Sequence, residues 1–437
     1  MQFTKSLQLQ KKFNDTIPGG SHTYAKGDDQ WPEFMPPYIE RGKGCHIWDI
    51  DGNEFIEYGM GLRTVTLGHG FEPIVQAACK QMKLGTNFVR PAKIELDCAE
   101  EFLSVIEGAE MVKFSKDGSD ATNGAVKLAR AYTGRDMVAV CANHPFFSVD
   151  DWFIGITPMS AGIPEVVKQM TVKFFYNNIE SVEKMFADYP GKISCVILEA
   201  EKYDPPVDHF LHKLRDVAHK NGALFILDEM ITGFRWHLGG AQKMYDIVPD
   251  LSTFGKALGN GFAISALAGK REFMELGGLH HNKERVFLIS TTHGAENHAL
   301  AAAIANIKFF KENKVIEQLD EQGRKLTEGV NQASKELGIY DHVRIIGPNC
   351  CSVYTTSDQD GKPSQPFRTL FIQECMKRGL LMPSSIVSYS HSDQDIRETI
   401  EKMAEAMVVY KKALDEGIDK YLVGRPVAPV FRKYNNE

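Results

Sequence analysis

Hydrophobic positions along the middle of the chain follow two alternating patterns. Short apolar runs bounded by turn-forming residues predict buried strands, and the clearest are residues 137–142, 170–175, 193–198 and 223–227. Apolar residues at helical spacing fill the gaps between them, for instance over 209–221. Strands that alternate with helices predict βαβ units, so we expect an α/β domain with a mostly parallel sheet.

The two ends of the chain carry a different pattern. Residues 37–58 alternate between apolar and polar positions around Asp51-Gly52, which predicts an antiparallel β-hairpin. Helical spacing over 3–16, 316–337 and 392–414 predicts helices, with short strands between the last two. We therefore expect a large domain over 71–312 and a smaller α+β domain made from residues 1–70 and 313–437.

Composition narrows the class of protein. The 437 residues are 43% hydrophobic and 24% charged, as in ordinary globular proteins, and the net charge of −7 argues against nucleic-acid binding. The 8 cysteines form no CxxC pair and no zinc-finger spacing, so they predict a reducing compartment and no metal site. Neither a signal peptide nor an apolar run of membrane-spanning length is present, and we expect a cytoplasmic protein that contacts no membrane.

Two charged residues indicate the chemistry. Asp228 directly follows the predicted strand 223–227, at the carboxyl end where parallel sheets bind ligands. Lys256 lies between Phe254-Gly255 and a glycine-rich stretch, which predicts a loop. Pyridoxal phosphate forms a Schiff base with a lysine and needs an acid at its pyridine nitrogen. The alternative for each residue is an ordinary one, a helix cap for Asp228 and a solvated lysine for Lys256.

The neighbouring residues favour the cofactor. The stretches LDEMITGFR and FGKALGNGF resemble the aspartate and lysine motifs of class III (fold-type I) pyridoxal-phosphate-dependent aminotransferases, closest to the glutamate-1-semialdehyde 2,1-aminomutase branch. PGGSHTYAKG, WDIDGNEFIEYGMG and LGHGFEPIVQA match the opening of the family in order. The resemblance implies a seven-stranded sheet between helices, with Lys256 as the Schiff-base residue and Asp228 at the ring nitrogen.

Residues 117–121 (DGSDA) open a helix whose apolar positions recur at helical spacing. A glycine at the first turn and a helix N-terminus suit a phosphate, although the same residues also suit a capped helix without a ligand. The family has Ser-Gly-Thr-Glu-Ala here, so the resemblance assigns the phosphate to Gly118 and Ser119. Asp117 departs from the family serine, and its carboxylate would repel a phosphate unless it points away or caps the helix.

The resemblance also implies residues around the cofactor ring. Phe146 would stack on one face of the ring and Met230, where the family has valine, would cover the other. Glu199 matches the acid of the family Glu-Pro pair, although Ala200 replaces the proline. Thr292 matches a threonine that reaches the phosphate from the partner subunit, which implies a homodimer with shared active sites.

The expected substrate contacts depart from the aminomutase. Lys26 stands where that enzyme has an arginine, and lysine is a poorer bidentate partner for a carboxylate. Residues 383–391 are shorter than the aminomutase segment and contain no glutamate. Arg63 offers a cation where the family has an aromatic segment. The acids and aromatics of 146–153 suit a sugar-like or aminopolyol ligand, or equally a domain or dimer contact.

These residues lead to one main prediction and two alternatives. We predict an aminotransferase that moves an amino group from an amino-acid donor to a carbonyl acceptor. The first alternative is glutamate-1-semialdehyde 2,1-aminomutase, which would use the same residues on one carbon skeleton. The second is a non-catalytic relative of the same fold, and a Schiff-base lysine argues against it. A nucleotide-binding enzyme has no support, because no GxGxxG or P-loop pattern opens a helix.

Overall fold

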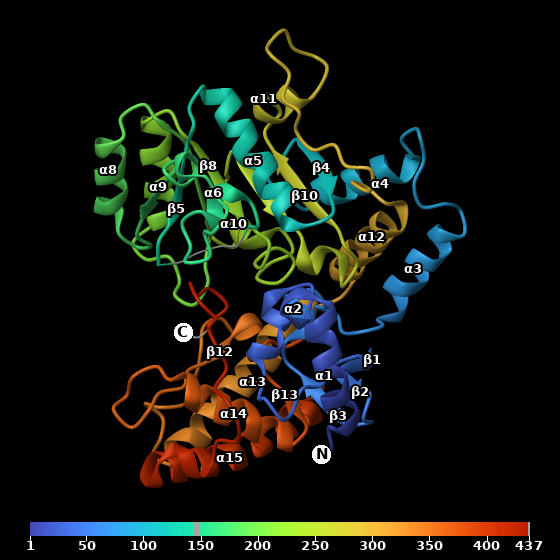
Figure 1. The fold of residues 1–437 in the computed structure, drawn as a ribbon. Coiled ribbons are helices and arrows are strands. Elements are labelled where there is room, and N and C mark those ends of the chain that lie inside the picture. Colours follow the sequence, from blue (N-terminus) through green and yellow to red (C-terminus); the bar gives the residue numbers. More distant parts are fainter. Residues whose placement is uncertain (144–147, 436–437) are drawn as a thin grey trace. The chain divides into compact units, whose positions relative to one another are not determined.

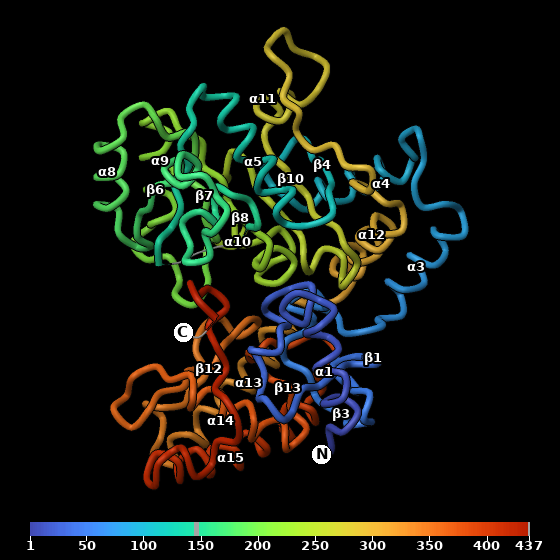
Figure 2. Tube along the Cα trace, in the orientation of Figure 1, coloured from blue at the N-terminus to red at the C-terminus, as the bar shows by residue number. Residues whose placement is uncertain are grey.

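The structure is a computed structural model that describes residues 1–143 and 148–435. The chain divides into two compact units (Figure 1). The larger unit contains Arg63–Val65 and Glu72–Ile316, and the smaller contains Met1–Leu62, Thr66–Phe71 and Glu317–Glu437. Figure 2 follows the blue start and the orange-to-red end of the chain into the same, smaller unit.

The larger unit is built on a seven-stranded sheet in the order β4-β10-β9-β8-β7-β5-β6. Every neighbouring pair is parallel except the two that include β10, which confirms the predicted mostly parallel sheet. The strands are β4 (Met111–Ser115), β5 (Met137–Cys141), β6 (Thr171–Phe174), β7 (Ile193–Glu199), β8 (Leu224–Asp228), β9 (Leu251–Phe254) and β10 (Ser265–Gly269).

Alternating side chains of the central strands enter two separate hydrophobic cores. In β8, Leu224 and Ile226 pack in the core that contains α5 (Gly118–Thr133), whereas Phe225 and Leu227 pack in the core with α8 (Ile179–Asp188) and α9 (Phe210–Lys220). Both faces of the sheet are therefore covered, which explains why these strands read as continuous apolar runs.

The remaining helices of the larger unit are shorter or lie at the edge of the sheet. Helix α12 packs against α3 and α4, as Figure 1 shows. The bounds are α3 (Glu72–Met82), α4 (Lys93–Leu103), α6 (Asp151–Ile154), α7 (Glu165–Lys168), α10 (Gly240–Met244), α11 (Arg271–Met274) and α12 (Asn297–Glu312).

The smaller unit has a four-stranded sheet, β1-β2-β3-β13, in which segments from both ends of the chain pair. The predicted turn at Asp51-Gly52 joins β2 (His46–Asp49) to β3 (Glu54–Glu57), and β1 (Ile39–Lys43) adds a further antiparallel strand. The Asp49 carboxylate accepts hydrogen bonds from the Asp51 and Asn53 amides, which holds this turn closed.

The C-terminal part of the smaller unit contributes β13 (Leu380–Leu381), which runs parallel to β3. A separate antiparallel pair joins β11 (Ile345–Ile346) to β12 (Val353–Tyr354). The helices are α1 (Thr4–Thr16), α13 (Val315–Glu336), α14 (Gln365–Lys377) and α15 (Asp393–Glu416), and α13 begins in the larger unit. Among the described residues, every helix is too short or too polar to cross a lipid bilayer.

Candidate functional site

Two acids lie side by side at the carboxyl edge of the larger sheet. Glu199 ends β7 and Asp228 ends β8, and the two residues are paired in the parallel register. Strand alternation puts both side chains on the face that carries α5, because Ile197 and Ile226 also point to that face. Asp228 is 1% exposed and Glu199 is 3% exposed, so the sheet edge holds two buried carboxyl groups next to each other.

The Asp228 carboxyl group is oriented by two donors. Its Oδ1 accepts hydrogen bonds from the Met230 backbone N–H at 3.0 Å and from the Thr253 hydroxyl at 2.9 Å. Burial raises the pKa of Asp228 above its ordinary value, and the Lys256 ammonium and the two hydrogen bonds oppose that shift. A cationic partner would stabilise this buried carboxylate further, which fits the protonated ring nitrogen of the predicted cofactor.

The Glu199 carboxyl group has an oxygen without a hydrogen-bond donor in the described part of the chain. Burial raises its pKa to about 7, the Lys202, Lys256 and Arg63 charges oppose the rise, and the Asp228 carboxylate adds to it. Its Oε2 is buried and accepts no hydrogen bond from the described residues. A buried oxygen without a donor is costly, so this atom fits the expected position of Glu199 next to a bound polar group.

Lys256 follows β9 and opens a single 3-10 turn, Lys256–Gly259, where an open loop was predicted. The backbone of Lys256 has φ 41°, a left-handed conformation that costs about 1–3 kcal/mol outside glycine. Asn306 of α12 holds the turn, since its Nδ2 donates to the carbonyl oxygens of Ala257 at 2.9 Å and Leu258 at 3.1 Å. These two hydrogen bonds fix the turn to α12. The positive charge of Lys256 lowers the pKa of both Asp228 and Glu199 against the effect of burial.

Helix α5 begins at the predicted phosphate turn. Asp117 is its N-cap, and the carboxylate accepts hydrogen bonds from the amides of Ser119 at 2.8 Å and Asp120 at 3.1 Å. Asp117, which stands where the family has serine, therefore caps the helix. The Ser119 hydroxyl accepts from the Val149 amide at 3.0 Å, which turns its own hydrogen toward another acceptor. Gly118 and Ser119 fit a phosphate, but the phosphate competes with Asp117 for two amides.

Further acids surround this turn. Burial raises the pKa of Asp150, and the neighbouring Asp117 and Asp120 carboxylates add to that rise. Asp150 accepts a hydrogen bond from the Ser148 hydroxyl at 2.8 Å. The negative potential works against a bound dianion, so the helix dipole and the Ser119 hydroxyl must offset it.

Met230 packs against two glycines of the site. A Cβ atom at Gly118 would come within 2.9 Å of the Met230 sulfur, and one at Gly255 within 2.7 Å. The thioether therefore lies between the phosphate turn and the residue before Lys256, which suits its expected role as one wall of the ring site. Phe146, expected on the opposite face of the ring, lies outside the described residues.

The remaining predicted residues have different surroundings. Arg63 belongs to the larger unit, its carbonyl accepts from Arg235 at 2.7 Å, and its charge lowers the pKa of Glu199. Lys26 is an exposed residue of the smaller unit. Thr292 is exposed, and its carbonyl accepts from the Asn87 side chain at 2.8 Å. The structure thus brings Arg63 near Glu199 and leaves Thr292 exposed on the surface.

Two of the aromatic residues in the proposed sugar-binding run, Trp152 and Phe153, are wrongly assigned to a ligand surface. Trp152 and Phe153 are each 4% exposed and pack in the core against α5. Only Asp151 of this run is exposed within α6. These two rings are therefore core residues and offer no surface for the C–H faces of a sugar, whereas Phe146 and Phe147 lie outside the described residues.

The sequence analysis did not identify two residues that position the site. Thr253 orients Asp228, and Asn306 anchors the Lys256 turn. Both are polar residues that are 0% exposed; Thr253 lies in the fully buried strand β9 and Asn306 in a mostly apolar stretch of α12. A polar residue at a core position was the available signal, because such a group is buried only when it is hydrogen-bonded.

The raised pKa of Glu199 predicts a pH-dependent stability of the cofactor-free protein. Between pH 4.5 and 7 the folded chain retains a proton that the unfolded chain loses, so unfolding becomes easier as pH rises. The loss from this group is about 3 kcal/mol across the window. We expect Glu199→Gln to remove it, measured by denaturant unfolding at several pH values, whereas Glu183→Gln at an exposed position of α8 should not. Parallel pH profiles of wild type and Glu199→Gln would contradict the prediction.

Comparisons with known proteins agree with this geometry. The sequence model of the family described as aminotransferase class-III matches residues 27–419. Glutamate-1-semialdehyde 2,1-aminomutase from Sulfurihydrogenibium azorense is 33% identical over 94% of this chain and 100% of its own length. The enzyme of the same name from Persephonella marina is 32% identical over 92% of this chain and 98% of its own. Among solved structures, the PLP form of the FumI protein from Sphingopyxis sp. MTA144 has a TM-score of 0.86 at 26% identity, and covers 94% of this chain and 98% of FumI.

Proposed function

Because the chain belongs to the class-III aminotransferase family and its cofactor is pyridoxal 5'-phosphate, we propose that it moves an amino group from an amino-acid donor to a carbonyl acceptor. One observation carries the proposal: two buried acids and the lysine whose charge acts on both lie at one edge of the sheet. A scaffold without catalysis needs neither the buried acids nor a left-handed lysine. Both features cost stability and are typical of functional sites.

When bound, pyridoxal phosphate supplies an electron-accepting ring that stabilises the negative charge left when a substrate Cα–H bond breaks. Asp228 would hold the ring nitrogen protonated. The hydrogen bonds from Thr253 and from the Met230 backbone fix the orientation of its carboxylate. Gly118 and Ser119 would hold the phosphate. The Nζ atom of Lys256 would take the proton from the substrate Cα and return it at the neighbouring position.

A second candidate is glutamate-1-semialdehyde 2,1-aminomutase activity. The names of the curated relatives favour it, since two enzymes so named cover nearly the whole chain at 32% and 33% identity. The residues expected at the substrate from the resemblance favour the aminotransferase, because Lys26 stands where the aminomutase has an arginine and residues 383–391 lack a glutamate. We assign Arg63 to an anionic group of the substrate, since it is a cation near Glu199.

Turnover without an added amino donor separates the two candidates. The holoenzyme is mixed with glutamate-1-semialdehyde alone, and 5-aminolaevulinate is measured over many turnovers. An aminotransferase should stop after about one amino group per active site, because no donor recharges it. A panel of amino-acid donors and carbonyl acceptors should then restore turnover. Sustained production of 5-aminolaevulinate without a donor would establish the mutase instead.

We also propose that the active unit is a homodimer. An exposed apolar stretch supports this, since Leu84, Phe88 and Val89 are 68%, 55% and 100% exposed. The stretch is bonded to the Thr292 segment, as Asn87 donates to Thr292 and the Thr86 carbonyl accepts from Asn297. Exposed apolar side chains of this size are typical of a protein–protein interface, and here the interface would carry Thr292.

Mixed dimers test whether Thr292 serves the partner's site. Lys256→Ala and Thr292→Val proteins, each with low activity, are unfolded, mixed in equal amounts and refolded together. If Thr292 acts across the interface, each mixed dimer contains one site without any substitution, and about a quarter of wild-type activity should return. If both residues serve the same subunit, both sites of a mixed dimer stay impaired, and activity should not recover. Lys256→Ala mixed with Lys256→Arg is the matched control.

A further inference from the structure

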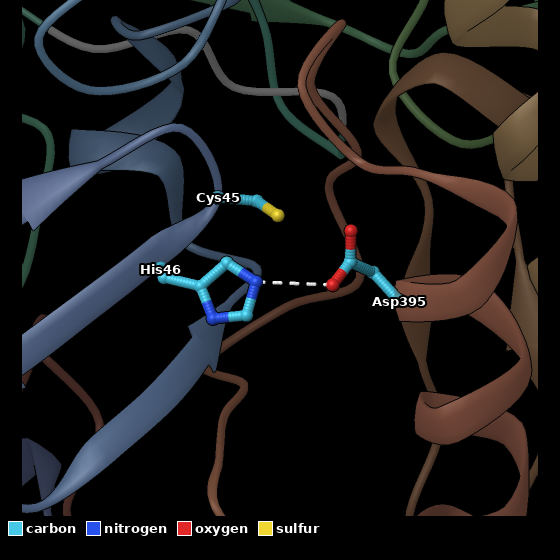
Figure 3. Close-up of side chains that lie close together, drawn as sticks. All are labelled: Cys45, His46 and Asp395. Carbon is cyan, nitrogen blue, oxygen red and sulfur yellow. Dashed lines mark hydrogen bonds and ion pairs between the residues drawn. The ribbon is translucent and has the colours of Figure 1, made fainter.

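A cluster in the smaller unit is unrelated to the site described above. Cys45 lies in the turn between β1 and β2, His46 opens β2, and Asp395 lies in the first turn of α15. Figure 3 shows the three side chains directed at one another. Their possible ligand atoms all lie within 4.8 Å of each other, and no other such group of histidine, cysteine and acidic residues occurs among the described residues.

The His46 ring lies between two carboxylates. Its Nε2 is 3.0 Å from Asp395 Oδ1, and its Nδ1 is 2.9 Å from Glu54 Oε1. A histidine that binds a metal through one ring nitrogen commonly presents the other nitrogen to a carboxylate, which fixes the ring and its tautomer. Glu54, which is outside the set of three ligands, lies within ion-pair distance of Nδ1 but makes no hydrogen bond to it.

Asp395 is held in place from the opposite side. Its Oδ2 accepts from the Ser392 amide at 2.8 Å and the Ser392 hydroxyl at 2.6 Å, in the capping box of α15. Oδ1 therefore faces His46, and the carboxylate lies within 4.8 Å of the Cys45 sulfur. Cys45 is 1% exposed, and its sulfur is 3.6 Å from the Ser390 carbonyl. Two of the three ligand side chains are thus fixed before any ion binds.

The charges of the three groups match a divalent cation. A Cys45 thiolate and the Asp395 carboxylate carry two negative charges, and His46 is neutral when it binds a metal.

From this geometry we propose that Cys45 Sγ, His46 Nε2 and Asp395 Oδ1 bind a divalent transition-metal ion, with zinc as the best match to a sulfur, nitrogen and oxygen donor set. Binding releases the thiol proton of Cys45 and any proton on His46 Nε2. Tetrahedral zinc needs ligand atoms about 3.3–3.6 Å apart, so shifts of about 1 Å close the site. Water fills the fourth position.

The bound ion would join segments far apart in the sequence. The β1–β2 turn and the start of α15 would be cross-linked, so the ion would stabilise the smaller unit instead of taking part in amino transfer. In the competing state without an ion, His46 Nε2 stays hydrogen-bonded to Asp395 Oδ1 and Cys45 Sγ stays paired with the Ser390 carbonyl.

Zinc binding to the holoenzyme is the first test. The protein is treated with a chelator, dialysed, and titrated with zinc by calorimetry and elemental analysis. We expect one zinc per chain, at least about 100-fold weaker binding in Cys45→Ser, and about 10-fold weaker binding in Glu54→Gln. Cys351→Ser, at another buried thiol of the same unit, should bind as wild type. Equal binding by wild type and Cys45→Ser would overturn the proposal.

Spectroscopy of the unaltered protein decides the question even if Cys45→Ser fails to fold. Zinc-edge X-ray absorption should show one sulfur at about 2.3 Å together with nitrogen and oxygen ligands. Cobalt substitution should give tetrahedral bands at wavelengths longer than the cofactor absorption. A coordination shell without sulfur, octahedral cobalt, or no stoichiometric metal would each overturn the proposal.

Discussion

Replacing Lys256 with alanine is expected to lower the rate of amino transfer by at least about 100-fold, up to about 10,000-fold. This is the range for losing a positioned general base, and the covalent attachment of the cofactor is lost with it. The rate is measured in a single turnover, with an amino-acid donor added to the cofactor-loaded protein. The result would place Lys256 at the reacting atoms and would exclude a scaffold.

Borohydride gives an independent readout of the same prediction. In the wild type, reduction should bleach the visible band and fix the cofactor to the peptide that contains Lys256, as mass spectrometry would show. Lys243→Ala is the matched control, because Lys243 is a solvent-exposed lysine paired with Glu107. A label on another lysine, or full activity of Lys256→Ala, would contradict the assignment.

Asp228→Asn is expected to lower the rate of amino transfer by about 100-fold to 1,000-fold. The amide oxygen can still accept from Met230 and Thr253, so the shape is kept and the charge opposite the ring nitrogen is lost. The cofactor-free variant should be at least as stable as wild type at pH 7, because burial raises the pKa of Asp228 and ionisation of the carboxyl group is costly. A lower rate of amino transfer without a lower stability would show that the substitution affects catalysis and not folding.

Thr253→Val should give a smaller loss, about fivefold, since it removes one hydrogen bond to the carboxylate. The pH dependence of the visible absorption of the bound cofactor reports the protonation of its Schiff-base nitrogen, and the pKa of that nitrogen responds to the charge on the ring nitrogen in each variant. Asp216→Asn, at an exposed position of α9, is the control. An unchanged pH profile in Asp228→Asn, together with unchanged rates, would remove Asp228 from the site.

Much of the larger unit could be predicted from periodicity. The apolar runs at 193–198 and 223–227 lie within a residue of β7 and β8, because a strand buried on both faces must be apolar at every position. The smaller unit was less predictable. Strand β13 has only two residues, and it is a strand because the edge of β3 is there to accept it. Short pairings of this kind leave no periodic signal.

In the site, too, some residues are identified by their local sequence and others only by the tertiary structure. Asp228 and Lys256 are identified by their own neighbours in the sequence, and Gly118-Ser119 by the helix that they open. The orientation of Asp228 needs Thr253, 25 residues away in the chain, and the Lys256 turn needs Asn306, about 50 residues away. For Trp152 and Phe153 the sequence analysis predicted a ligand surface, because they are aromatic and close to the site in the sequence. In the structure they are core residues.

The sequence by itself determined which chemical groups are available: a lysine in a glycine-flanked turn, an acid at the end of a buried strand, and a helix start able to accept a phosphate. Tertiary structure decided which of them meet. Strand alternation and register put Glu199 beside Asp228 on the α5 face, and the fold of the smaller unit put Asp395 against Cys45 and His46 across about 350 residues. The physical reason is that spacing along a chain encodes only local geometry, whereas buried charges acquire their pKa values and partners from segments that packing brings together.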